Sequence, residues 1–190
     1  MKRIATRWRA VGNRLSLLRN FRRDPGGVAA VEFALIVPVA LVLLTGTIVY
    51  GDAIAIDRKV TLTARTVTDL VTQYSALTLS QVQVLLGASS LMVAPYSASN
   101  IIVTVSEVTV NGAGAATIAW SQSTPNGTPR AQGSTVTLPS SIDTPGAFYI
   151  WGEVQYTYTP TVGYQVTGSI VLHDSTYMSP RVSTSIPPPT

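Results

Sequence analysis

The 190-residue chain contains no cysteine, which excludes disulfide bonds, thiolate metal sites and a cysteine nucleophile. Its one histidine, His173, stands directly before Asp174 near the end of an expected strand. A His–Asp pair without a third oriented group is more typical of a protein surface than of a catalytic site. The sequence also lacks a Gly-x-Ser-x-Gly elbow, a phosphate-binding glycine loop and a His-Glu-x-x-His zinc helix. We therefore expect no enzyme, no cofactor and no metal site.

Charged residues are few, at 12% of the chain, and the two signs are segregated. Residues 1–23 carry eight basic groups and no acidic one, whereas the remaining residues carry five basic and nine acidic groups, a balance of −4. The basic character of the chain therefore comes from its leader, and we expect no nucleic-acid partner. A basic cluster before an apolar run follows the positive-inside rule, which predicts a cytoplasmic leader over residues 1–27 and places Asp52 onward across the membrane. A basic RNA-binding tail is the alternative interpretation.

An apolar run extends from Val28 to Tyr50, and Glu32 is the only charged residue among its 23 positions. A helix of this length reaches ~34 Å, which is enough to cross the ~30 Å hydrocarbon core of a bilayer. We therefore predict a transmembrane helix over residues 28–50. A cleaved signal peptide is the alternative, although both the basic region and the apolar run are longer than such a peptide usually has.

Glu32 lies about one turn inside the apolar run, where an isolated carboxylate is costly. If the chain were cut after Gly27, Val28 would become the first residue and would carry a free α-amine. Glu32 of one subunit could then pair with that amine on an adjacent subunit, and each buried charge would satisfy the other. We therefore predict that Glu32 is an assembly carboxylate.

Three further residues of the run are predicted to shape helix packing. Pro38 removes one backbone donor inside the span and is expected to kink the helix. Gly46 leaves a shallow place where another helix could approach. Phe33, directly after the carboxylate, is the third residue to which we assign a packing role.

The segment Arg23–Pro38, which reads RDPGGVAAVEFALIVP, resembles the opening of TadE-like (TadE/TadG) pseudopilins of the tight-adherence, or Tad/Flp pilus, machinery. Within it, Gly27 to Phe33 is similar to the processing site of type IV pilin-like proteins. The resemblance covers residues 21–75, and the leader charge, glycine, glutamate, proline and helix length agree together. Phe33 after Glu32 is similar to minor pseudopilins, whereas the major pilins of this system have Glu-Tyr.

This resemblance implies a minor pseudopilin that assists assembly of a Tad/Flp-type adhesion pilus. It implies a single-pass protein of the bacterial inner membrane, with a cytoplasmic N-terminus and a C-terminal domain in the periplasm or in the pilus. The implied partners are other pilin and pseudopilin subunits, the Tad secretion machinery, the lipid bilayer and a prepilin peptidase that cuts between Gly27 and Val28. The alternative is an unprocessed membrane-anchored periplasmic module whose outer domain binds a ligand or a surface.

Residues 51–95 are expected to be helical. An apolar stripe predicts an amphipathic continuation of the first helix, packed either on the protein's own sheet or on a partner helix. The pattern Ser80-x-x-Gln83 predicts a capping box that opens a second helix from Gln81 to about Met92. The residues of the stripe are Ile56, Val60, Thr63, Val67, Leu70, Tyr74 and Leu77.

Residues 96–182 are expected to form a β-rich domain, followed by a proline-rich tail at residues 183–190. The predicted fold class is α+β and pilin-like, in which a long N-terminal helix, membrane-spanning and then amphipathic, precedes a small antiparallel sheet. Alternating and β-branched residues predict the strands, and a turn at residues 111–114 joins the first two as a hairpin. The expected strands are Ile101–Val110, Ala116–Gln122, Phe148–Thr159 and Gln165–Leu172, with an exposed loop over Ser123–Gly133.

Two sets of side chains in this domain leave alternatives open. Its tyrosines could form an adhesive surface, although strand aromatics more often pack across a sheet. Its acidic residues are scattered and could bind a cation only if folding gathers them. The tyrosines are Tyr156, Tyr158, Tyr164 and Tyr177, and the acidic residues are Glu107, Asp143, Glu153 and Asp174.

Overall fold

The computed structural model describes residues 25–190, so the basic groups of residues 1–23 lie outside the described part. The chain divides into two units between Ile48 and Val49, and we describe each unit in turn. In chain order the elements are α2 (Pro25–Thr72), α3 (Leu79–Met92), the 3-10 helix η1 (Ala98–Asn100), β1 (Ile101–Val110), β2 (Ala116–Ser123), β3 (Thr135–Val136), β4 (Phe148–Tyr158), α4 (Tyr164–Thr167) and β5 (Ile170–Met178).

The described part of the first unit is residues 25–48 of α2, and its apolar side chains are exposed on all sides. Leu35 is 71% exposed and Phe33 is 68% exposed, and none of the apolar membrane-length window is buried within the protein. A helix that is apolar all round needs lipid or other helices to cover it. Its length and composition are sufficient to cross a membrane, which confirms the predicted membrane-capable helix.

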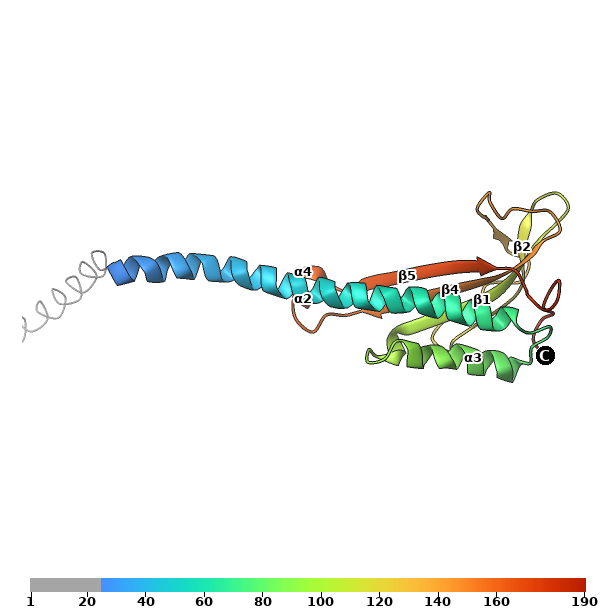
Figure 1. Ribbon diagram of the computed structural model, residues 1–190, viewed down its shortest axis with the longest axis horizontal. Helices are drawn as coiled ribbons and strands as arrows, with labels where there is room; N and C mark the ends of the chain where they lie inside the picture. Colours follow the sequence, from blue (N-terminus) through green and yellow to red (C-terminus); the bar gives the residue numbers. More distant parts are fainter. Residues whose placement is uncertain (1–24) are drawn as a thin grey trace, which may run out of the picture. The chain divides into compact units, whose positions relative to one another are not determined.

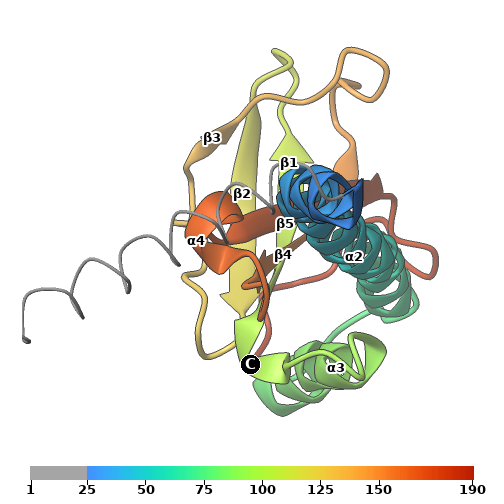
Figure 2. The ribbon, with the colours of Figure 1, turned by 90° about the vertical axis from the view of Figure 1, so that its left-hand side faces the viewer.

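In the second unit, the rest of α2 packs against a curled five-stranded antiparallel sheet of order β3-β2-β1-β4-β5 (Figures 1 and 2). Ile56, Val60 and Val67 are at most 1% exposed and share one core with residues of β1 and β4. The stripe therefore packs on the protein's own sheet, which was one of the two alternatives. A helix followed by an antiparallel sheet also confirms the α+β class. The stripe is shorter than expected, because α2 ends at Thr72 and Tyr74 is exposed.

The helix and the sheet approach each other closely at Gly152 of β4. A Cβ atom at this position would collide with the hydroxyl of Thr68 and would lie 3.3 Å from the carbonyl oxygen of Ala64. Thr68 is fully buried, and its hydroxyl donates to that same carbonyl at 2.6 Å, so its polar group is satisfied within the helix. A glycine in the strand facing a small helical surface thus allows the two backbones to approach.

The first half of the sheet agrees with the prediction. β1 has the predicted bounds and pairs with β2 as the expected hairpin, and β4 ends one residue earlier than expected. The register between β1 and β2 shifts between Glu107 and Val108. The short edge strand β3 was not predicted, because its two residues are too few to show an alternating pattern.

Two predicted boundaries are wrong. The capping box of α3 joins Thr78 to Gln81 rather than Ser80 to Gln83: the Gln81 N–H donates to the Thr78 hydroxyl at 3.2 Å, and the Thr78 N–H donates to the Gln81 side chain at 2.9 Å. The helix accordingly begins at Leu79.

The last strand occupies Ile170–Met178, where we expected Gln165–Leu172. Gly163 and Gly168 have positive φ angles of 80° and 64°, and they enclose the single helical turn α4. This turn uses the first residues of the expected strand, so the extended segment starts only after Gly168. β5 then pairs antiparallel with β4 from Ile150 to Tyr158.

The C-terminal segment packs against the ends of the two helices. The Arg181 N–H donates to the Thr72 carbonyl at 2.9 Å, and the Leu79 N–H donates to the Thr190 carbonyl at 3.0 Å. Ile186 between them is fully buried in the main core. The proline-rich residues therefore close the end of the second unit.

We predict that Gly152→Ala destabilises the second unit by about 1–3 kcal/mol, because the added methyl group overpacks the contact with Thr68. Thermal unfolding of the full chain in detergent, followed by circular dichroism, measures the change in Tm. Gly112→Ala is the matched control, since a Cβ there meets no atom within 4 Å. Equal Tm values for the two variants would contradict the close contact.

Candidate functional site

The start of α2 brings together the residues predicted for processing and assembly. Gly27 and Val28 lie in its first turns, and the helix continues without a break to Glu32. Glu32 is four residues after Val28, so their side chains lie on the same side of the helix, about 6 Å apart along its axis. Val28 is 52% exposed and Glu32 is also exposed, so both are open to a neighbouring molecule.

Glu32 differs from the other polar residues of the apolar run. The Thr45 hydroxyl donates to the Leu41 carbonyl at 2.8 Å, and the Thr47 hydroxyl donates to the Leu43 carbonyl at 2.8 Å. These threonines need no outside partner in a membrane. Within residues 25–190, no basic side chain forms an ion pair with Glu32. Glu32 is therefore the one charged group of this run, and its partner has to come from outside the run.

The three predicted packing residues do not share one face of the helix. Gly46 lies about four full turns after Glu32 and is on the same side, and a Cβ there would meet no atom within 4 Å. Phe33 and Pro38 project from other sides of the helix. Pro38 lies inside α2, as expected. The structure thus groups Gly46 with the carboxylate and separates the other two.

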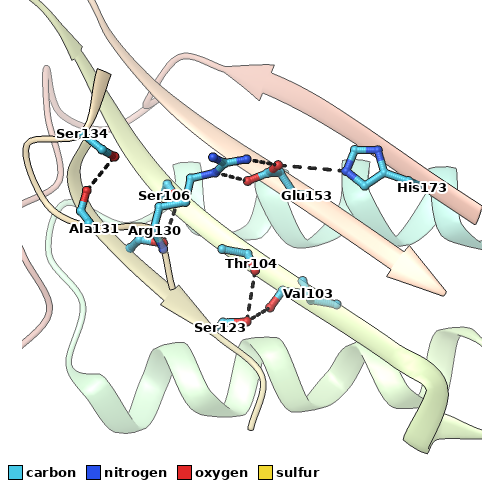
Figure 3. Close-up of polar contacts among 10 residues, drawn as sticks. Val103, Thr104, Ser106, Ser123, Arg130, Ala131, Ser134, Glu153 and His173 are labelled. Atoms are coloured by element: carbon cyan, nitrogen blue, oxygen red, sulfur yellow. Dashed lines mark hydrogen bonds and ion pairs between the residues drawn. The ribbon is translucent and has the colours of Figure 1, made fainter. Parts of the chain in front are cut away.

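A second polar cluster lies on the sheet face opposite α2, where β4 and β5 meet the loop after β2 (Figure 3). The Arg130 guanidinium binds Glu153 through two hydrogen bonds, from Nε to Oε2 at 2.6 Å and from Nη2 to Oε1 at 2.7 Å. His173 Nε2 lies 4.0 Å from Glu153 Oε1. The loop is held in place because the Arg130 N–H donates to the Ser121 hydroxyl at 3.0 Å.

An aromatic stack supports this cluster. The rings of Trp151 and Tyr177, cross-strand neighbours on β4 and β5, stack with centroids 5.2 Å apart, and Arg130 Cζ lies 4.0 Å from the Trp151 ring centroid. Burial raises the pKa of the Tyr177 hydroxyl. Tyr156 is 2% exposed and belongs to the main core, whereas Tyr164 is 47% exposed. Tyr156 and Tyr177 therefore pack within the sheet, which favours that alternative over an adhesive tyrosine surface.

Beside the cluster lies a cavity of about 370 Å³. Its lining includes the side chains of Asn126, Gln155 and His173, which can donate and accept hydrogen bonds. Within residues 25–190, no three histidine, aspartate or glutamate side chains gather closely enough to hold a metal ion. Folding therefore does not bring the scattered acidic residues into one site. The hydrogen-bonding side chains in the lining of the cavity suit a polar ligand.

Glu107 has a structural role that we did not predict. Its side chain is 3% exposed and accepts a hydrogen bond from the Ile186 N–H at 2.6 Å, while the indole N–H of Trp120 donates to the Ile186 carbonyl at 2.7 Å. Burial raises the pKa of the Glu107 carboxyl. The alternation of β1 contained the signal, because Glu107 falls in step with the buried residues Val103 and Val105. Glu107 and Trp120 thus bind the backbone N–H and the carbonyl of Ile186, the buried residue of the C-terminal segment.

The model of the TadE-like protein family matches residues 27–69. This match confirms the resemblance proposed from the sequence, and it covers most of α2, including Glu32 and the helical residues packed on the sheet. A comparison with curated proteins and a comparison with solved structures found no match. Together with the membrane-capable helix, the family match indicates a membrane protein associated with the Tad pilus.

We predict that Glu107→Gln changes the pH dependence of stability. Because burial raises the folded-state pKa above its ordinary value of 4.5, the folded protein holds this proton more tightly than the unfolded chain does. Stability supplied by the neutral carboxyl is therefore lost as pH rises through the folded-state pKa. Glutamine keeps the oxygen that accepts from Ile186 but cannot ionise, so the variant avoids this loss.

The measurement is the Tm of the wild type and of Glu107→Gln in the full chain, at about pH 4 and at about pH 8. We expect similar values in acid and a higher Tm for the variant at the higher pH. A difference between the two proteins that does not change with pH would contradict a raised pKa at Glu107.

Proposed function

We propose that this protein is a minor pseudopilin that assists assembly of a Tad/Flp-type adhesion pilus, held in the bacterial inner membrane by residues 28–50. The observation that carries the proposal is the coincidence of the family match with α2, whose apolar part has one charged residue. Assembly would proceed through this helix, and the second unit would contact other pilus components. The basic leader supports a cytoplasmic N-terminus and a periplasmic second unit, which would remain there or enter the pilus.

Processing by a prepilin peptidase between Gly27 and Val28 is part of this proposal. Cutting there would create an α-amine on Val28, a residue that lies about 6 Å from Glu32 along the helix axis. A neighbouring subunit displaced along the axis by about one turn would bring its Val28 amine to the level of this carboxylate. The pair would satisfy both charges inside the membrane, so it would favour one axial offset over others.

The positions of the packing residues support a division of roles. Gly46 is on the side of Glu32 and offers open space, so the subunit that supplies the amine could also approach closely there. Phe33, which is 68% exposed, and Pro38 project elsewhere and would face other helices or lipid. The proposed partners are therefore further pilin and pseudopilin subunits and membrane components of the Tad secretion machinery.

A second candidate function is an unprocessed membrane-anchored periplasmic binding module. The polar cavity beside Arg130, Glu153 and His173 favours this candidate, because hydrogen-bonding side chains line a space of about 370 Å³. Such a module would keep its leader and would need no partner for Glu32 beyond the membrane surface.

We predict that Glu32→Gln leaves membrane insertion unchanged but reduces co-assembly, because the amide cannot form an ion pair with an α-amine. The measurement is affinity purification of the full chain from solubilised membranes, with quantification of the pilin and pseudopilin subunits that co-purify. Thr47→Val is the matched control, since the Thr47 hydroxyl is already bound to its own helix.

The control variant should co-purify with its partners as the wild type does. If Glu32→Gln also retains its partners in wild-type amounts, Glu32 has no role in assembly. If both variants lose their partners, the span is sensitive to any polar change, and the ion pair is not the reason.

A further inference from the structure

The connection between β4 and β5, residues 159–169, lies against the beginning of the second unit. A Cβ atom on Gly163 in this connection would be 3.8 Å from Cγ2 of Val49, which is itself buried. At the end of β4, the Tyr158 hydroxyl donates to Asp52 Oδ2 at 3.3 Å. This hydrogen bond and the close approach of the Gly163 backbone to Val49 therefore place this end of the sheet beside residues 49–52 of α2.

The Tyr158 hydroxyl can donate its hydrogen bond to Asp52 over a wide pH range. Burial, with a smaller effect of the nearby Asp52 charge, raises the pKa of the Tyr158 hydroxyl above its ordinary value of 10.0. The phenol therefore stays protonated and can donate to the carboxylate at physiological pH.

Residues 49–52 mark the place where the apolar run ends. Val49 and Tyr50 are its last residues, and Asp52 is the first charged residue after Glu32. If residues 28–50 cross the bilayer, Val49 and Tyr50 lie at the boundary between the hydrocarbon core and the headgroups. Gly163 of the β4–β5 connection lies close to Val49, so the connection would then be at the same boundary.

The composition of the connection fits such a boundary. Residues 159–169 contain no charged side chain, and they expose Val162 at 55% and Tyr164 at 47%. On α2, Tyr50 is 66% exposed at the same level. Tyrosine is enriched where membranes meet water, because its ring is apolar and its hydroxyl can remain hydrated. Single exposed apolar residues are common on proteins, but here they lie next to the end of the apolar run of α2.

We propose that the β4–β5 connection is a lipid-contacting loop, in which Val162 and Tyr164 enter the interfacial layer of the leaflet next to the second unit. The loop and the helix would then form two separate attachments of this unit to the membrane. The inference rests on the proposed membrane anchor. A lipid surface is the occupant because the loop lies beside Val49, at the end of the proposed span, and exposes one apolar and one aromatic side chain there.

The absence of cysteine makes the experiment direct, since each introduced cysteine is the only thiol in the chain. The variants Val162→Cys and Tyr164→Cys test the loop, and Leu41→Cys reports on the span. Ala113→Cys, in the exposed turn between β1 and β2, is the matched control. Each full-length variant is labelled with an environment-sensitive fluorophore and reconstituted into vesicles of phosphatidylethanolamine and phosphatidylglycerol, with and without bromine on the acyl chains.

We expect a blue-shifted emission and a loss of fluorescence with brominated lipid at residues 41, 162 and 164, and neither change at residue 113. Quenching at residue 41 without quenching at 162 and 164 would overturn the lipid-contacting loop and leave the anchor standing. No quenching at residue 41 would overturn the proposed anchor and the loop with it. A blue shift at 162 and 164 that is unquenched and grows with protein density would assign the loop to a contact between copies, and so overturn lipid contact.

Discussion

The packing of residues 49–72 of α2 against β1 and β4 is the constraint on which the rest of the second unit depends. The sheet can come this close because β4 has a glycine, Gly152, opposite Ala64 and Thr68 of the helix. Val60 and Val67 then share one buried core with both strands and with α3. The hydrophobic effect supplies the driving force for this contact, and the small residues determine its distance. With no cysteine in the chain, this core takes the place that disulfides hold in many small exported domains.

The same helix has two parts that differ in burial. Before residue 49 its apolar side chains are uncovered, and after residue 49 one face is buried on the sheet. The change occurs where the first charged residue after Glu32, Asp52, accepts a hydrogen bond from Tyr158 of β4. One helix, α2, therefore contains both the membrane-length apolar part and the part packed on the sheet. The family match, which covers residues 27–69, includes both the uncovered and the packed part of that helix.

Sequence alone predicted the features that depend on long periodic patterns. The apolar run, the buried stripe at Ile56, Val60 and Val67, and the β1–β2 hairpin repeat one pattern over many residues, so a single exception does not hide them. The prediction was wrong where two neighbouring residues fit the same short motif equally well. Thr78 and Ser80 could each open a capping box with a glutamine three residues later, and Thr78 is the one with the extended backbone that a cap requires.

The remaining differences come from tertiary contacts. The residues of α4 were predicted to begin a strand. They form a helical turn because the glycines on either side of them, Gly163 and Gly168, adopt positive φ angles. Ile186 lies in a proline-rich stretch with no periodic pattern, and its burial depends on Glu107 and Trp120 far away in the sequence. The grouping of Arg130, Glu153 and His173 likewise requires the register of β4 and β5 and the path of a loop. The packing roles of Phe33, Pro38 and Gly46 and the assembly role of Glu32 stay predictions.

The central claim is that α2 becomes an assembly helix whose first residue is Val28. Mass spectrometry of the mature N-terminus, in cells with and without the prepilin peptidase, tests it most directly. The account predicts a chain that starts at Val28 when the peptidase is present and at Met1 when it is absent. A chain that keeps Met1 in both kinds of cell would contradict the account, and the unprocessed anchored module would then be the better description.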